Sequence, residues 1–303
     1  TGCAIRLDQN YNTAYRLKPR YNPGVNDYWI CDEGRFGWKF IHDEKRITRP
    51  VVRRGSKAEP LAWASLDEVA RQRFEDIVEK HGSVSVGVQL SPEMSCEEAW
   101  LLATFIRSIS PDATLVLGDV KTEGEDERFP TGATNGDTKF IIRSEKHPNR
   151  KGVEMVIDAF GGNRLTAPEL VERVDEFKAL WIVGGYPNAD WPSEALADAV
   201  AKLELSVVQD MFPNALTVEA DIVLPFCAWL ERDGCFVNHD GKIQPFSRAI
   251  NPPEGAMRDG QYLFTLAGFE GLYTAERVRK LMAESMPAHA NLHVPPAKPA
   301  HQH

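Results

Sequence analysis

The sequence predicts an α/β protein in which a small β-rich unit precedes a body built around a parallel sheet. Two observations support this prediction. Before residue 61, short alternating stretches and turn residues replace helical periodicity. From residue 61 onward, runs rich in β-branched residues alternate with helical segments, as in βαβ units with helices on both sheet faces. The predicted strands of the body lie at residues 83–89, 114–118, 180–184, 205–209 and 222–225.

The first unit is taken as residues 1–55. Residues 5–7 and 14–17 are expected to be short strands, with turn residues at 10–12 between them. Residues 46–55 are rich in arginine, so they are expected to form a basic connector to the body.

The body is expected to open with an amphipathic helix, with Ser65 as its N-cap and Glu68 as the capping-box partner. Residues 119–150 are rich in glycine, proline and charge, which predicts a long loop broken by a strand at 139–143. Residues 234–244 are expected to form a hairpin that turns at the central Asn-His-Asp-Gly. Further helices are predicted at 96–109, 152–160, 167–178, 193–202 and 274–284.

Composition restricts the classes of partner. The formal net charge is −9, from 35 Lys and Arg against 44 Asp and Glu. A nucleic-acid partner is therefore not expected, because binding it requires a basic stripe that neutralises phosphates. No apolar run approaches the roughly 20 residues needed to span a bilayer. Any membrane association is expected to come through other subunits.

The cysteines are odd in number and widely scattered, which is a poor basis for a disulfide framework. This distribution favours a reducing compartment or a metal site. No Ser-His-Asp or Cys-His arrangement suited to nucleophilic catalysis can be argued from the pattern, so no catalytic residue is assigned. The five cysteines are Cys3, Cys31, Cys96, Cys227 and Cys235.

Two of these cysteines carry the sharpest motif. Cys3 ends a Thr-Gly-Cys triplet, and Cys31 lies in the run Trp-Ile-Cys-Asp-Glu-Gly-Arg at residues 29–35. A 4Fe–4S cluster needs four thiolates, and usually three come from one tight loop and the fourth from a distant turn. With residues 16–26 between them, the two cysteines resemble the end of that loop and the turn carrying the fourth cysteine in molybdopterin oxidoreductases. The resemblance implies that Cys3 and Cys31 are the third and fourth ligands, and that the first two precede Thr1 in a longer protein.

The same resemblance implies a tuning role for Arg35. A cation beside the cluster would stabilise the more negative reduced state and raise the reduction potential. An exposed arginine paired with Asp32 or Glu33 is the other interpretation, as two unrelated reduced thiols are for Cys3 and Cys31. Because two thiolates cannot hold a 4Fe–4S cluster, the fragment alone is expected to bind no stable cluster.

A second block, residues 219–244, resembles a stretch near the end of the third domain of the same family. Asp221 is expected to anchor the turn before a buried strand. Glu231 and Asn238 are expected to hold the following hairpin through backbone hydrogen bonds. Two cysteines of this block are expected to be buried small hydrophobes rather than ligands, namely Cys227 and Cys235.

A third segment, residues 180–187, is a predicted strand that ends in Gly-Gly-Tyr-Pro. In cofactor-binding members of the family, a comparable strand end carries Gly-x-Asn-Pro against the nucleotide end of the pterin cofactor. Tyr186 stands in place of that Asn, and no Gly-x-Gly-x-x-Gly spacing for a dinucleotide is present. Bound molybdopterin is therefore not expected, and a tight strand-to-loop turn is the simpler interpretation.

The resemblance covers nearly the whole chain and is strongest to the large iron–sulfur subunit of bacterial NADH-quinone oxidoreductase (complex I). It implies a partial 4Fe–4S domain at 1–55, a molybdopterin-oxidoreductase-like α/β region at 56–284 and a disordered tail at 285–303. The implied function is electron transfer from NADH toward quinone through iron–sulfur clusters, with the α/β region as scaffold. The implied partners are other peripheral-arm subunits, on the cytoplasmic side of the inner membrane.

Two other functions fit the same residues. One is a fragment of a catalytic molybdopterin oxidoreductase such as a formate dehydrogenase, which co-purifying pterin or molybdenum would support. The other is a cofactor-free interaction domain that has lost its cluster, which the lack of upstream cysteines would support.

Overall fold

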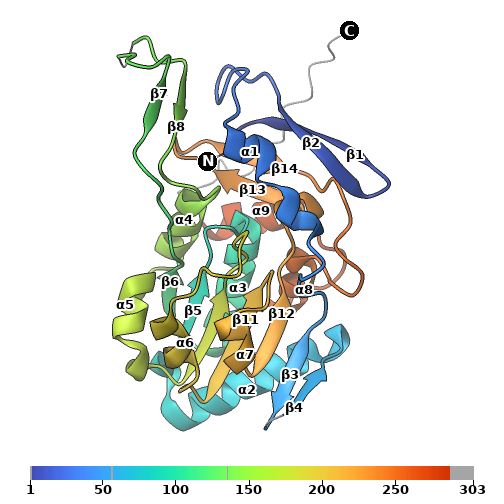
Figure 1. Ribbon diagram of the computed structural model, residues 1–303. Helices are drawn as coiled ribbons and strands as arrows, with labels where there is room; N and C mark the ends of the chain where they lie inside the picture. Colours follow the sequence, from blue (N-terminus) through green and yellow to red (C-terminus); the bar gives the residue numbers. More distant parts are fainter. Residues whose placement is uncertain (1, 56, 135, 287–303) are drawn as a thin grey trace.

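The centre of the computed structural model is an eight-stranded sheet (Figure 1). The structure describes residues 2–55, 57–134 and 136–286. The strand order is β4-β3-β12-β11-β10-β5-β6-β9; neighbours from β12 to β9 are parallel, whereas β3 pairs antiparallel with β12 and β4. The parallel core confirms the predicted βαβ body. The strands are β3 (Val51–Arg54), β4 (Lys57–Pro60), β5 (Val86–Leu90), β6 (Thr114–Leu117), β9 (Arg164–Thr166), β10 (Ala179–Val183), β11 (Leu205–Asp210) and β12 (Ile222–Pro225).

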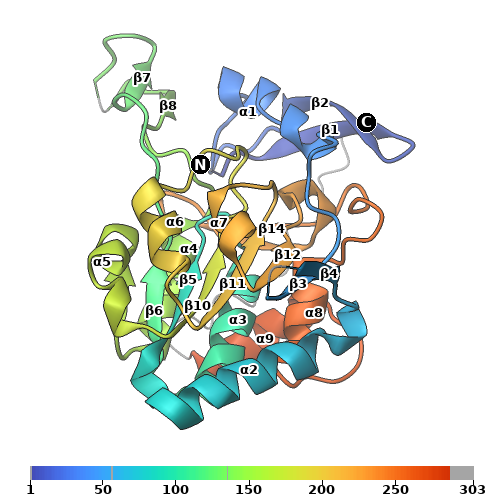
Figure 2. The same ribbon diagram turned by 60° about the horizontal axis from the view of Figure 1, so that its bottom comes forward.

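Helices cover both faces of this sheet (Figure 2). The larger core cluster joins one face to α2 (Leu66–His81), α3 (Cys96–Ile109), α4 (Arg150–Phe160), α8 (Asp259–Leu266) and α9 (Ala275–Ser285). The smaller cluster joins the other face to α5 (Ala167–Glu172), α6 (Glu194–Val200) and α7 (Ala215–Glu219).

Burial on both faces explains why the central strands read as continuous apolar runs rather than alternating ones. Every residue of β5, β10 and β11 is buried. Trp181 of β10 lies between Phe74 and Phe105, with ring centroids 6.2 and 5.9 Å away. These aromatic contacts fix α2 and α3 against the same face of the sheet.

The N-terminal unit lies beyond the carboxyl ends of the parallel strands (Figure 1). It contains the antiparallel hairpin of β1 (Ile5–Asn10) and β2 (Thr13–Pro19), as predicted. Tyr11 and Asn12 form its turn with φ of +47° and +66°, a conformation that Asn tolerates better than most residues. The unit continues with α1 (Asp32–Phe36) and the 3₁₀ helix η1 (Lys39–His42).

Two further hairpins flank the N-terminal unit. The arm formed by β7 (Glu127–Phe129) and β8 (Phe140–Ile142) projects from the predicted loop at 119–150 (Figure 1). The second hairpin, β13 (Gly234–Val237) with β14 (Ile243–Phe246), confirms the predicted one. Its turn is held by Asn238, whose Oδ1 accepts hydrogen bonds from two backbone amides at 3.0 and 2.9 Å.

The predicted N-cap of the first helix of the body is wrong. Ser65 has a helical backbone and ends the 3₁₀ helix η2 (Trp63–Ser65), which runs directly into α2, so its side chain makes no capping hydrogen bond. A capping box occurs instead at α3. There Ser95 Oγ accepts from the Glu98 amide at 3.2 Å, and Glu98 Oε2 accepts from the Ser95 amide at 2.9 Å.

Several boundaries also differ. Residues 83–85 form a 3₁₀ turn before β5, the helix predicted for 167–178 ends at Glu172, and the basic connector at 46–55 includes β3. The short α7, α8 and β9 were not predicted, because too few residues carry their periodicity. Of the predicted tail, residue 285 belongs to α9, and residues 287–303 lie outside the described residues. Among the helices that the structure describes, none has the length and apolar character needed to cross a bilayer.

A buried carboxyl group ties α8 to the sheet. Asp259 is fully buried, and its two oxygens accept from Gln209 Nε2 at 2.6 Å and from the Cys227 amide at 3.0 Å. Burial, together with the nearby charge of Glu98, raises the pKa of Asp259 to about 7. The folded protein therefore keeps a proton on Asp259 at pH values where the unfolded chain has released it.

This shift predicts a pH-dependent stability. Between about pH 4 and 7 the folded state binds the extra proton, so the free energy of unfolding falls as pH rises, by up to about 1.4 kcal/mol per pH unit. Below about pH 4 both states are protonated and the contribution is constant. Urea unfolding at pH 5, 6 and 7 should show this slope, and Asp259→Asn should reduce it. An equal slope in both proteins would show that another group titrates.

Candidate functional site

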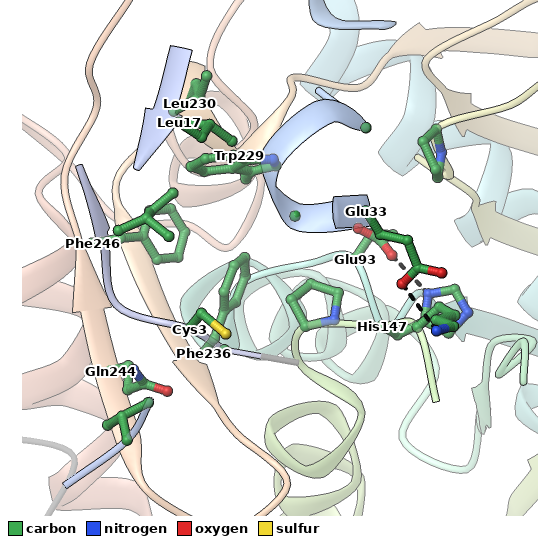
Figure 3. Close-up of a pocket in the computed structure, with 18 of the residues that line it drawn as sticks. Cys3, Leu17, Glu33, Glu93, His147, Trp229, Leu230, Phe236, Gln244 and Phe246 are labelled. Atoms are coloured by element: carbon green, nitrogen blue, oxygen red, sulfur yellow. Dashed lines mark hydrogen bonds and ion pairs between the residues drawn. The ribbon is translucent and has the colours of Figure 1, made fainter. Parts of the chain in front are cut away.

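A cavity of about 2450 Å³ lies between the N-terminal unit and the α/β body (Figure 3). It is referred to below as the central cavity. Its walls come from the N-terminal unit, the β7–β8 arm, the β13–β14 hairpin and the loops that follow the parallel strands. In doubly wound sheets, ligands bind at this carboxyl edge, so the cavity occupies the position expected of a functional site.

The cavity brings together the two cysteines that the sequence singles out. Cys3 and Cys31 are both partly buried and both line it. Burial raises the pKa of the Cys3 thiol, and the electrostatic effect of Cys31 adds to this rise. Both thiols therefore belong to the lining of the same cavity.

Cys31 is the N-cap residue of α1. Its Sγ accepts a hydrogen bond from the Gly34 amide at 3.4 Å, and its backbone is extended, with φ −71° and ψ 163°. The buried Ile30 lies beneath this turn, since a Cβ on Gly34 would stand 3.1 Å from its side chain.

Cys3 is held against the β13–β14 hairpin by its neighbour Gly2. Gly2 has φ +90°, and a Cβ there would stand 2.7 Å from both Asn238 Cβ and Gln244 Oε1. Only glycine allows this approach of the chain to the hairpin. Cys3, Gln244 and Phe236 all line the central cavity (Figure 3).

Arg35 lies in α1, partly buried, and is not among the residues that line the central cavity. Its guanidinium has no hydrogen bond or ion pair within the described residues. It is therefore not paired with Asp32 or Glu33; Glu33 instead pairs with Lys146 at 2.9 Å and links α1 to the body. The tuning role of Arg35 stays a prediction.

In the part of the chain that the structure describes, no three His, Cys, Asp or Glu side chains come together in a metal-binding group. Cys3 and Cys31 thus offer two sulfur side chains to the same cavity. A four-thiolate cluster would need two more from elsewhere.

The opposite wall of the cavity lies at the point where the strand order reverses, between β5 and β10. Tyr186 lies at this point. It is buried, and its hydroxyl donates a hydrogen bond to the Asp119 carbonyl at 2.7 Å. Its ring packs against Trp191 and His147, with centroids 4.6 and 5.3 Å away. His147 in turn contacts Glu93, with Nδ1 and Oε1 2.7 Å apart.

The backbone amides of Gly184 and Gly185 at this reversal point already have acceptors, the first in the Gln209 carbonyl. Asp210, fully buried, accepts from the Gly185 amide at 2.9 Å, from Trp191 Nε1 at 2.8 Å and from Asn214 Nδ2 at 2.6 Å. Burial raises the pKa of Asp210, and these donors oppose the rise. The nearby helix starts are also capped by their own side chains, at α3 by Ser95, at α6 by Ser193 and at α7 by Asn214.

The second sequence block is only partly as expected. Asp221 anchors β12, since its Oδ2 accepts from the Ser206 amide and hydroxyl at 2.8 and 3.0 Å. The role given to Glu231 is wrong: it does not hold the hairpin but forms a buried ion pair with Arg46 at 2.6 Å. Two cysteines are buried, as predicted: Cys227 and Cys235.

Sequence reasoning missed two cavity features. It did not connect Gln244 with Cys3, although both belong to blocks that carry the resemblance. It also missed the pair of Glu93 and His147, because neither residue lies in a recognisable spacing.

Comparisons with known proteins agree with this architecture. Residues 144–268 match the family model for molybdopterin oxidoreductases. Similar curated proteins include the α subunit of an NADPH-Fe(3+) oxidoreductase from Geobacter sulfurreducens, 28% identical over 55% of this chain and 19% of that protein. The α subunit of an F420-dependent formate dehydrogenase from Methanocaldococcus jannaschii is 32% identical over 40% of this chain and 19% of that protein. A subunit of the NADH-quinone oxidoreductase from Streptomyces coelicolor is 32% identical over 35% of this chain and 12% of its own length.

These matches therefore span 19% or less of the length of each relative. Among solved structures, acetylene hydratase from Pelobacter acetylenicus superimposes with a TM-score of 0.58, at 12% identity, over 88% of this chain and 68% of the hydratase. At that identity the likeness concerns the fold alone. The α/β body with its parallel-rich sheet is thus molybdopterin-oxidoreductase-like, as the sequence resemblance implied.

Proposed function

We propose that the chain is part of an electron-transfer subunit in which Cys3 and Cys31 ligate a 4Fe–4S cluster and the α/β body serves as scaffold. The observation that carries this proposal is that both thiols line the central cavity. The donor set fits the group, because both side chains are sulfur ligands of the kind that hold iron–sulfur clusters. When bound, the cluster would supply one-electron transfer.

The complete protein would provide the remaining two thiolates, from residues that precede Thr1. The cavity wall under Cys3 is apolar, with Phe236 and Phe246 packed at a centroid distance of 4.4 Å. Such a wall limits water at the cluster, and solvent access is one of the factors that set its potential. The one-electron function requires no proton-transfer residue, and none is assigned.

The protein that fits best is the large iron–sulfur subunit of NADH-quinone oxidoreductase, which would carry electrons from NADH toward quinone. The sequence block at 29–35 and the similarity to the Streptomyces coelicolor subunit support this choice. Other peripheral-arm subunits would then be its partners, at the cytoplasmic side of the inner membrane. The exposed aromatic side chains of the N-terminal unit are suited to such contacts; they are Tyr11, Tyr15, Tyr21, Tyr28, Trp29 and Phe36.

A catalytic molybdopterin enzyme is the alternative, and the similarity to formate dehydrogenase α subunits is what favours it. A pterin dinucleotide carries phosphates, which bind free backbone amides at strand ends and helix starts. At the reversal point the Gly185 amide already donates to Asp210, and the buried Tyr186 follows β10 there. These occupied groups support the scaffold role, which we prefer.

The test is the iron and acid-labile sulfide content, with a reduced-state EPR spectrum, of the protein produced from its complete reading frame and purified without oxygen. We expect roughly four irons per chain for the wild type and loss of the cluster in Cys31→Ala. Cys227→Ala is the matched control, because that thiol is buried and donates to the Met257 carbonyl at 3.3 Å. It should keep its iron.

Two outcomes would contradict the proposal. A wild type without iron would make the protein a structural subunit with a vestigial site. Pterin or molybdenum bound in stoichiometric amount would instead support the catalytic alternative.

A further inference from the structure

One buried asparagine joins the two cysteine segments of the N-terminal unit. Asn26 is 3% exposed. Its Oδ1 accepts a hydrogen bond from the Ala4 amide at 2.8 Å, and its Nδ2 donates to the Ala4 carbonyl at 3.2 Å and to the Trp29 carbonyl at 2.7 Å. Ala4 directly follows Cys3, and Trp29 lies two residues before Cys31. A single carboxamide therefore bridges the backbone segments that carry the two thiols; these three contacts are referred to below as the Asn26 bridge.

The contacts of Asn26 define its orientation. The Ala4 amide is a donor, so the atom that it contacts must be the oxygen, and the nitrogen then faces two carbonyl acceptors. The backbone of Asn26 is also engaged, since its carbonyl accepts from the Trp29 amide at 2.7 Å and its amide donates to the Asn22 carbonyl at 3.1 Å. A buried carboxamide with all its donors satisfied holds a single arrangement of its neighbours.

The segment of Cys3 depends on such contacts because it lies outside the strand pairing. β1 begins at Ile5, and its register with β2 includes no earlier residue. The Ala4 carbonyl accepts one further hydrogen bond, from the Arg20 amide at 2.9 Å. Thiolates that ligate one cluster must be held at a fixed spacing, and that spacing is set here by contacts between loops.

We infer that Asn26 is a positioning residue that sets the spacing of Cys3 and Cys31. It acts through the backbone of Ala4 and Trp29 and is not among the residues that line the central cavity, so the inference requires no contact with the cluster. The role in positioning ligands rests on the proposed function, whereas the bridge itself can be tested without iron. Three hydrogen bonds of ordinary strength favour the bridged arrangement by at least about tenfold.

Two substitutions and one control test the bridge. Asn26→Leu is similar in size and removes all three side-chain hydrogen bonds. Asn26→Asp keeps an acceptor for the Ala4 amide but places an oxygen where Nδ2 meets two carbonyls, so it should release the Trp29 side. Asn22→Ala is the matched control, because Asn22 lies in the same loop and its Oδ1 accepts from the Gly24 amide, two residues away, at 3.2 Å.

The first measurement is amide hydrogen exchange of the complete protein, followed by mass spectrometry. In Asn26→Leu, peptides covering residues 2–10 and 27–36 are both expected to exchange about tenfold faster, while those covering β5 and β10 keep their wild-type rates. Asn26→Asp should speed exchange at 27–36 more than at 2–10, and Asn22→Ala should change neither segment. Faster exchange of only one segment in Asn26→Leu, or an equal rise in the body, would overturn the bridge.

The second measurement distinguishes positioning of the ligands from support of the fold alone. In the complete, cluster-loaded protein, Asn26→Asp is expected to release iron to a chelator about tenfold faster than the wild type. Its reduced-state EPR spectrum should also broaden, because the ligand geometry then varies between molecules. Asn22→Ala should match the wild type in both readouts.

The outcomes separate this inference from the proposed function. Loaded Asn26→Asp protein with the release rate and spectrum of the wild type would overturn the positioning role and leave the cluster assignment intact. A wild type without iron would overturn the proposed function and the positioning role with it, whereas the exchange result would still decide whether the bridge exists.

Discussion

Replacement of Arg46 by Met is expected to lower the free energy of unfolding by roughly 3–5 kcal/mol, because it leaves the buried Glu231 carboxylate without its cation. The side chains of both residues are 2% exposed. Their contact is bidentate, with Arg46 Nη1 and Nη2 2.6 and 2.7 Å from the two oxygens of Glu231. Arg46 Nη1 also donates to the Ile41 carbonyl at 2.7 Å, so the N-terminal unit and the body are joined here.

The matched control is Arg16→Met. Arg16 also pairs with a carboxylate, Asp8, at 2.6 Å, but the two side chains are 63% and 37% exposed. Exposed pairs contribute roughly 0–1 kcal/mol, so this variant should be nearly as stable as the wild type. Urea unfolding of both variants gives the comparison.

The double variant Arg46→Met, Glu231→Met completes the test. Without either charge, the site no longer holds an uncompensated ion, and part of the lost stability should return. A loss below about 1 kcal/mol in Arg46→Met alone would mean that water reaches Glu231, and that the pair does not fix the N-terminal unit on the body.

The parallel-sheet body could be predicted because the sequence pattern of each strand is local. β5, β10 and β11 are fully buried, and strands buried on both faces keep their apolar character residue by residue. The hairpin at 234–244 was predictable for the same reason, since its turn residues sit next to one another. The cap at Ser65 failed because the preceding η2 already gives that residue a helical backbone, which the residue pattern does not reveal.

The sequence predicted the candidate site only where a motif links residues that lie far apart along the chain. The two cysteine runs pointed to one site, and the structure places Cys3 and Cys31 in one cavity. Glu231 was misplaced because its partner Arg46 lies far away along the chain, where the sequence reads only as a basic connector. Burial of a charged group is a property of the assembled fold, so no local sequence pattern reveals it.

The fold also explains the tight turn at the end of β10. Its glycines were predicted to form a tight turn, and Gly185 does adopt φ +77°. What the sequence did not indicate is the neighbour that requires a glycine here. A Cβ on Gly185 would overlap the ring of Phe226, which is buried in the first loop after β12.

Gly185→Ala is therefore expected to lower the free energy of unfolding by roughly 2–5 kcal/mol, from the left-handed backbone and from overpacking against Phe226 together. Gly268→Ala is the control: Gly268 has φ +82°, but no atom lies within 4 Å of its added Cβ. It should cost only the backbone part, about 1–2 kcal/mol. Thermal and urea unfolding of the two variants isolate the packing contribution.

The comparison also bears on function. If Gly185→Ala lowers the free energy of unfolding no more than Gly268→Ala does, the Phe226 ring moves aside readily and the turn after β10 can change conformation. The Gly185 amide, held by Asp210 at 2.9 Å, would then be free to leave its acceptor, and the case against a bound nucleotide would weaken. If the cost is larger, as expected, the turn after β10 is rigid and keeps the Gly185 amide on Asp210, as the proposed scaffold role requires.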